Sequence, residues 1–296
     1  MEALRRSLRF NLGEHRKTRL KKATGGRSRT LLDRGVAEKH AIKLKNSYEK
    51  HCNLSDFNTN RLKYLTILHE LLELDIEQAL DSAKRMKQAV EEIFDDCDLW
   101  ALGVIEVELV NIELLEKIQA QDDNEKRKLA VLKSLAPKME LAGLNIPDTS
   151  GTKALIHSHI LVDLGKSIEQ QETRLRDELA ERWNKAYQVE LSGTYTNKTL
   201  KQNLTGIATY ATKGGNEQLK YKTGIRRDLG EDLEAKIWRG GSGRKDQGNE
   251  TVENERGLTI GEVGFLDALY DRLMSLRKDR RGYLISSTNN RRYRKG

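Results

Sequence analysis

Short apolar stretches alternate with longer amphipathic stretches along the first half of the chain. Residues 62–68 alternate between apolar and polar positions and include β-branched side chains, which predicts a half-buried strand. Between about residues 75 and 95, apolar side chains recur at helical spacing, which predicts a helix with one core-facing stripe. Residues 101–110 are rich in Val and Ile and contain no proline, so we expect a second strand there.

The second half continues this pattern after a polar insertion. Residues 113–141 are rich in Glu, Lys, Gln and Leu and predict a helical segment, which closes at a loop over residues 145–151. Residues 154–164 are apolar on both sides of two histidines and give the clearest strand prediction. A charged amphipathic helix, a short strand and a helix that stops at two glycines are then expected over residues 167–187, 188–195 and 197–213.

These elements predict an α+β fold with a central antiparallel sheet of four to five strands, helices on one face, and helical extensions at both ends. The other face of the sheet is expected to be open. We expect a basic N-terminal arm over residues 1–58 and a sheet domain over residues 59–225, with a helical insertion at about 111–150. The C-terminal extension, residues 226–296, combines a glycine-rich flexible linker with a short basic helix at about 264–278.

The charge of the chain indicates which class of partner it binds. The chain is 37% hydrophobic and 33% charged, with a formal net charge of +8. The first fifty residues hold fifteen Lys or Arg against five Asp or Glu. Such an arm favours salt-sensitive binding to nucleic acid, although a merely solubilising extension would have the same composition.

The cysteine content and the hydropathy of the chain indicate the cellular compartment in which we expect it. The two cysteines form no CxxC pair, which gives no sign of a structural zinc or a redox pair. No run of eighteen apolar residues and no secretory signal is present, so we expect a soluble, cytoplasmic protein without a membrane partner.

A pair of histidines marks the clearest strand. His157 and His159 are separated by one residue, so their imidazoles project from the same face and can share one cation. A carboxylate from the strand at 101–110 would complete a three-ligand site, and we favour Glu106 over Glu108, which shares its face. This donor set suits Mg²⁺ or Mn²⁺, and also Zn²⁺. The alternative is that both histidines are ordinary strand residues.

A second pair of polar residues lies near the end of the predicted helix at 197–213. Tyr210 and Lys213 are three positions apart, so both can address one phosphate from the same helix face. His69 follows the first strand, where we expect a surface histidine at a helix start rather than a ligand.

Taken together, these motifs resemble those of the HUH endonucleases, which initiate rolling-circle replication of plasmids and phages. Residues 64–68 look like the first strand motif of that family, residues 155–164 like the histidine motif, and residues 210–213 like its Tyr-x-x-Lys motif. The resemblance covers about residues 60–225. The chain departs from the pattern at Ser158, where the family usually has a bulky apolar residue.

The resemblance implies a catalytic role for each residue of the site. A divalent cation held by His157, His159 and Glu106 would polarise a scissile phosphate, and Tyr210 would attack it with help from Lys213. The product would be a 5′-phosphotyrosine link to DNA and a free 3′-hydroxyl for a polymerase. Positions 206 and 214 are both Gly, so the chain looks like the single-tyrosine variety.

The function implied by the resemblance is that of a replication initiator, which nicks and rejoins single-stranded origin DNA, with a host helicase and polymerase as further partners. One alternative is a relaxase or single-tyrosine transposase with the same site. Another is a non-catalytic basic nucleic-acid-binding protein. The sequence leaves the origin, the metal, the oligomeric state and the host open.

Overall fold

The computed structural model describes Gly25 and residues 28–52, 59–117, 123–141, 144–212, 259–275 and 283–287. The helices in these residues are α2 (Arg34–Cys52), the 3-10 helix η1 (Thr59–Arg61), α3 (Ile76–Asp96), α4 (Ile112–Lys117), α5 (Asp123–Leu135), α6 (Ile168–Arg182), α7 (Leu200–Ala211) and α10 (Ile260–Ser275). The strands are β1 (Leu62–Leu72), β2 (Trp100–Val110), β3 (Lys138–Leu141), β4 (Leu144–Pro147), β5 (Lys153–Asp163), β6 (Val189–Gly193) and β7 (Leu284–Ser286). None of the described helices is both long enough and apolar enough to cross a membrane.

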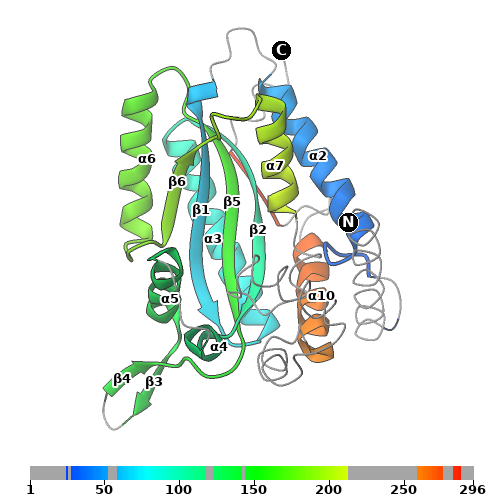
Figure 1. Cartoon of the computed structure of the whole chain (residues 1–296), viewed down its shortest axis with the longest axis vertical. Coiled ribbons are helices and arrows are strands. Elements are labelled where there is room, and N and C mark those ends of the chain that lie inside the picture. Colours follow the sequence, from blue (N-terminus) through cyan, green and yellow to red (C-terminus); the bar gives the residue numbers. More distant parts are fainter. Residues whose placement is uncertain are drawn as a thin grey trace, which may run out of the picture.

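A five-stranded antiparallel sheet forms the centre of the molecule, in the order β6-β1-β5-β2-β7. Strand β5 lies between the two other long strands, β1 and β2 (Figure 1). All of its side chains are buried. The predicted α+β class with a central antiparallel sheet is confirmed, and the predicted strands at 62–68, 101–110 and 154–164 correspond to its three long strands.

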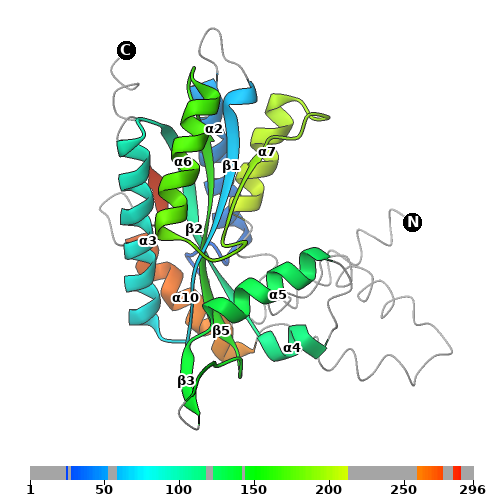
Figure 2. The same cartoon turned by 90° about the vertical axis from the view of Figure 1, so that its left-hand side faces the viewer.

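Helices cover both faces of this sheet. Helices α3 and α6 lie on one face, and α7 lies on the other (Figure 2). The predicted stripe of α3 faces the core through residues such as Ala83, Met86 and Val90, all fully buried. Helix α2 packs beside α7. Helices were predicted on one face only, with the other face open, and this part of the prediction is wrong because α7 covers the second face.

Residues 28–52 join the core of the sheet domain. Leu32, Leu44 and Tyr48 are buried in the same apolar cluster as the three central strands. The Tyr48 hydroxyl donates a hydrogen bond of 3.2 Å to the Leu102 carbonyl of β2. These residues were expected to form part of a basic arm over residues 1–58. Leu44 and Tyr48 are four positions apart, however, and form an apolar stripe among the cations that packs into the core. The remainder of the arm lies outside the described residues.

The C-terminal segment also contributes to the sheet. Strand β7 pairs with β2, and the Tyr270 hydroxyl of α10 accepts a hydrogen bond of 3.1 Å from the Val107 backbone N–H. The predicted helix at 264–278 is present as α10, and its Leu266, Leu269 and Leu273 are buried in the core. The described parts of the predicted extension thus belong to the core, and the predicted linker and basic C-terminal end lie outside the described residues.

The insertion differs from its prediction. Helices α4 and α5 are present, but the predicted helix does not continue to residue 141, because α5 ends at Leu135 and the strand pair β3 and β4 follows. Pro137 explains the stop, since it has no backbone N–H for a helix and disfavours helical backbone in the residue before it.

Candidate functional site

The centre of the sheet brings the predicted ligands together. Side chains of a strand alternate between faces, so His157 and His159 share one face of β5. Directly opposite residues of antiparallel strands share a face, and β2 pairs Glu106 with His157. All three side chains are buried, with relative exposures of 1% for Glu106 and 3% for each histidine.

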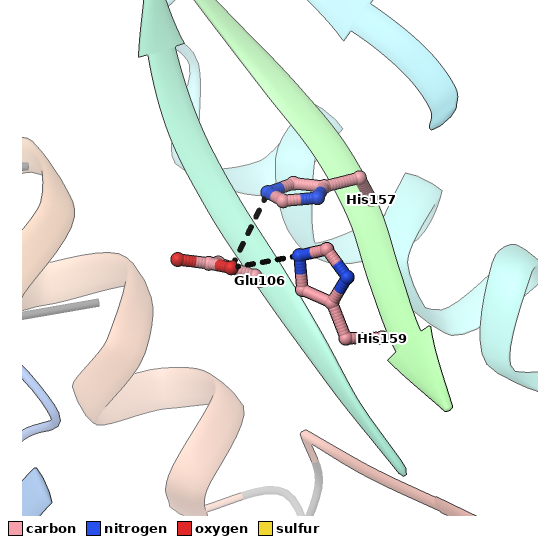
Figure 3. Close-up of side chains that lie close together, drawn as sticks. All are labelled: Glu106, His157 and His159. Atoms are coloured by element: carbon pink, nitrogen blue, oxygen red, sulfur yellow. Dashed lines mark ion pairs between the residues drawn. The ribbon is translucent and has the colours of Figure 1, made fainter. Parts of the chain in front are cut away.

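The geometry joins both imidazoles to one carboxylate oxygen. Glu106 Oε2 lies 3.2 Å from His159 Nε2 and 3.7 Å from His157 Nε2. Figure 3 shows both rings turned towards this carboxylate. One ligand atom from each of the three residues lies within 4.8 Å of the others. The group can therefore hold a metal ion, and the predicted ligand set is brought together.

The donor spacing fits a small divalent cation. Metal–nitrogen and metal–oxygen bonds near 2.1 Å separate neighbouring donors by about 3.0 Å at an octahedral right angle and by about 3.4 Å at a tetrahedral angle. The observed oxygen–nitrogen separations of 3.2 and 3.7 Å are close to these values.

Glu108 lies at the border of this group. Its Oε2 is 3.7 Å from His157 Nε2, and its side chain is 15% exposed. Among the described residues, Glu106 lies within ion-pair distance of both imidazoles, whereas Glu108 lies within ion-pair distance of His157 alone. This geometry favours Glu106 as the ligand and leaves Glu108 on the more open side of the site.

Strand β1 supports the second histidine. Thr66 pairs with His159 across the sheet, and its Oγ1 lies 3.2 Å from His159 Nδ1. If Nε2 binds a cation, Nδ1 would carry the proton and its N–H would donate a hydrogen bond to this hydroxyl. Thr66 would thus fix the tautomer and the plane of His159.

Helix α7 brings Tyr210 to the same group. The ring centroids of Tyr210 and His159 are 4.7 Å apart at an interplanar angle of 72°. The helix begins with a capping box between Thr199 and Gln202, and Tyr210 lies in its last turn, half-buried. The predicted tyrosine and histidines are therefore neighbours. Lys213 lies outside the described residues.

A second tyrosine completes an aromatic cluster that sequence spacing missed. The Tyr64 ring stacks on His159 at 5.7 Å and 6°, and meets Tyr210 edge-on at 6.3 Å. Burial, followed by the proximity of Tyr210, raises the pKa of the Tyr64 phenol well above its ordinary value. Tyr64 therefore stays a neutral phenol. Alternation along β1 places residues 64 and 66 on one face, which was the available signal.

The site face is not open as expected. Helix α7 lies over it with Tyr210, which is why all three predicted metal ligands are buried. His69 also differs from its prediction, because it lies within β1 and accepts a 2.9 Å hydrogen bond from the Trp183 indole N–H. It is half-buried and plays no part in the candidate site.

An ion-pair network fixes the end of β5. Asp163 is 3% exposed and binds the His51 imidazole at 2.7 Å and the Arg61 guanidinium through two bonds of 2.6 and 2.7 Å. Burial by itself raises the pKa of this carboxyl, but hydrogen bonds from His51, Arg61 and the Gly165 N–H outweigh it and hold the pKa below its ordinary value. The network joins α2, η1 and the histidine strand.

No protein-family model, curated protein or solved structure matches this chain. The fold and the site geometry are therefore the basis for assigning a function.

Proposed function

We propose that this protein is a metal-dependent enzyme that cuts and rejoins single-stranded DNA through a covalent link to Tyr210. The observation that carries the proposal is that the ring centroids of Tyr210 and His159 are only 4.7 Å apart. A tyrosine nucleophile needs a phosphate held and polarised beside it. Tyr210 and the three-ligand group come from segments far apart in sequence, yet they meet on one face of the sheet.

The buried ligand group favours a metal site over a structural ion pair. Three polar side chains on the central strands of a sheet give up apolar packing, and their donor atoms converge to within 4.8 Å of one another. Two imidazoles and one carboxylate leave open positions for a phosphate oxygen and water. This set suits Mg²⁺ or Mn²⁺, which would stabilise the negative charge that develops on a phosphate during transfer.

Tyr210 supplies the bond-making group. Its phenol oxygen attacks phosphorus, the new oxygen–phosphorus bond forms, and the bond from phosphorus to the 3′ oxygen of the preceding nucleotide breaks. The phenol loses its proton and the departing 3′ oxygen gains one. The bond energy is retained in the phosphotyrosine, so the reverse reaction rejoins the strand.

The more open side of the site indicates where DNA would enter. Tyr210 is half-buried, and the Glu108 side chain is partly exposed, whereas the three ligands are not. Glu108 is a carboxylate and would repel the phosphate unless a cation or a proton neutralises it. The phosphate would therefore approach beside Tyr210 and past Glu108 when the metal is bound.

A free 3′-hydroxyl suits the start of strand synthesis, so we propose that the reaction initiates rolling-circle replication of a plasmid or phage. The partners would be single-stranded origin DNA, a host polymerase that extends the 3′ end, and a host helicase. The motif resemblance of residues 60–225 supports this role.

The test uses one oligonucleotide labelled at either end. The full chain is incubated with Mn²⁺ and single strands that carry candidate origins. The expected result is a covalent protein adduct with the 3′-labelled strand, and a shortened, polymerase-extendable product from the 5′-labelled strand. Tyr210→Phe should abolish the adduct and leave metal binding intact.

Tyr64→Phe is the matched control, because Tyr64 is the neighbouring tyrosine in the same aromatic cluster. It should still form the adduct. The proposal is wrong if Tyr210→Phe forms the adduct as well as the unaltered chain does. It is also wrong if no candidate origin gives transfer of the 3′ label to the protein while metal and DNA both bind.

A further inference from the structure

The outer face of α7 is polar and free of carboxylates. Its exposed positions follow one helical stripe and are Lys201, Gln202, Thr205, Gly206 and Thr209. No Asp or Glu occurs anywhere in this helix, although 33% of the chain is charged. The stripe ends at Tyr210, so it offers phosphates an approach to the candidate nucleophile without charge repulsion.

Helix α6 shows the opposite character. Its exposed and half-exposed residues include the carboxylates of Glu169, Glu172, Asp177, Glu178 and Glu181, which outnumber the exposed arginines Arg174, Arg176 and Arg182. The excess of carboxylates disfavours a polyanion on this face, because repulsion between exposed like charges acts over about 10 Å at moderate salt. Charge therefore distinguishes the two helices as routes for a nucleic-acid strand.

An exposed aromatic ring precedes α7. The Tyr195 side chain is 68% exposed, and the Lys198 ammonium lies 4.1 Å from its ring centroid. The loop that carries it is held by Asn203, which is 6% exposed, accepts from the Tyr195 N–H at 3.1 Å and donates to the Tyr195 carbonyl at 2.9 Å. The backbone of the loop is therefore fixed while the ring stays accessible.

We propose that Tyr195 and the outer stripe of α7 form a track for single-stranded DNA that leads to Tyr210. One base stacks on the Tyr195 ring, and Lys198 and Lys201 neutralise adjoining phosphates. The strand then follows the helix, which rises about 1.5 Å per residue, so Leu200 and Tyr210 are about 15 Å apart along it. Figure 1 shows α7 running along the sheet from the loop after β6. This inference rests on the proposed function and assigns the substrate path to that site.

The chain offers a matched control for the aromatic ring. Tyr187 is 56% exposed and has the Arg127 guanidinium 5.2 Å from its ring centroid. It precedes β6, whereas Tyr195 follows β6, so the two tyrosines lie at opposite ends of that strand. Tyr187 therefore has the same local chemistry away from the stripe.

A second matched pair tests the stripe itself. Thr205 on α7 and Thr173 on α6 are both exposed helical threonines that donate to the carbonyl four residues earlier, at 2.7 and 2.9 Å. Glutamate at either position replaces an exposed hydroxyl with one negative charge. Only Thr205→Glu lies on the proposed track.

The experiment measures binding of a fluorescent thymidine oligonucleotide by anisotropy, with EDTA present so that no cleavage occurs. Tyr195→Ala should weaken binding by about 5- to 150-fold, the range expected for losing one stacked base, and Tyr195→Trp should restore it. Thr205→Glu should also weaken binding. Tyr187→Ala and Thr173→Glu should match the unaltered chain. In an oligonucleotide that carries 2-aminopurine, stacking on Tyr195 should quench the fluorescence of this base. Tyr195→Ala should abolish the quenching, and Tyr187→Ala should not.

The outcomes separate this inference from the proposed function. If the unaltered chain forms the Tyr210 adduct but Tyr195→Ala and Tyr187→Ala bind DNA equally well, the track is wrong and the function stands. If no adduct forms but Tyr195→Ala and Thr205→Glu selectively weaken binding, the track stands without the chemistry. Equal weakening by both members of each pair overturns the track.

Discussion

The Glu106 carboxylate lies 3.2 Å from His159 Nε2 and 3.7 Å from His157 Nε2, and thereby joins strands β2 and β5 at their centre. Glu106→Gln keeps the size of the side chain but removes its charge. We expect this change to lower Mn²⁺ affinity by more than about 10-fold, since even residues that only support metal ligands have effects of that size. Calorimetric titration of the full chain with Mn²⁺ measures it.

Glu108→Gln is the matched variant, because Glu108 shares the strand and the face and reaches His157 alone. Its loss of Mn²⁺ affinity should be clearly smaller. An equal or larger loss with Glu108→Gln would make Glu108 the principal carboxylate ligand and would contradict the ligand set given above.

Thr66 is expected to control the metal affinity of His159 from the neighbouring strand. Thr66→Val has the same shape but removes the oxygen 3.2 Å from His159 Nδ1. The loss of this orienting hydrogen bond should lower Mn²⁺ affinity by about 10- to 100-fold. The free energy of unfolding of the metal-free protein should change by only about 1 kcal/mol.

Thr66→Ser retains the hydroxyl and serves as the control. It should keep most of the metal affinity. If Thr66→Val and Thr66→Ser bind Mn²⁺ equally well, the hydroxyl does not orient His159.

The Asp163 network is expected to make stability depend on acid pH. Its folded-state pKa is lowered, so the carboxylate stabilises the fold above the unfolded pKa of about 3.9. That contribution is lost as the pH falls through the folded-state value. Asp163→Asn leaves the buried His51 and the Arg61 guanidinium without their anion, and should cost about 3 kcal/mol at neutral pH.

Urea unfolding at a series of pH values tests this expectation. The difference between Asp163→Asn and the unaltered chain should be largest near neutral pH and should shrink below about pH 3.9. Asp81→Asn, at an exposed ion pair, should leave the stability unchanged at neutral pH. A difference for Asp163→Asn that is constant over the whole pH range would show that the carboxylate charge is not what stabilises β5.

Strong periodic patterns made the central elements predictable. Alternation and β-branched residues marked the long strands, and the HxH spacing placed two imidazoles on one face, because strand geometry has a period of two. The choice of Glu106 required a guess at register, which the pairing with His157 supports. Local periodicity thus predicted that these three side chains would come together before any strand order was known.

Long-range packing was not predictable in the same way. The pairing of β7 with β2 and the burial of Leu44 and Tyr48 depend on contacts far apart in sequence. Tyr64 lies far from Tyr210 in sequence, so helical spacing gives no sign that their rings meet. A single sequence carries no signal for which helix will cover which face of a sheet.

Gly103 of β2 lies tightly against the backbone of the histidine strand β5. A Cβ at this position would lie 2.3 Å from the His159 carbonyl oxygen and 2.6 Å from the Ile160 Cα, and neither backbone atom can move without shifting the histidine strand. Gly103→Ala should destabilise the fold by about 1–3 kcal/mol or more and weaken Mn²⁺ binding, because β2 and β5 would separate next to the ligands. Gly206→Ala, on the exposed stripe of α7 with no atom within 4 Å, should instead stabilise the protein by about 0.5–1 kcal/mol, since alanine favours helices over glycine. Thermal unfolding and Mn²⁺ titration of both variants test these expectations. Equal unfolding temperatures and equal Mn²⁺ affinities for Gly103→Ala and Gly206→Ala would contradict them.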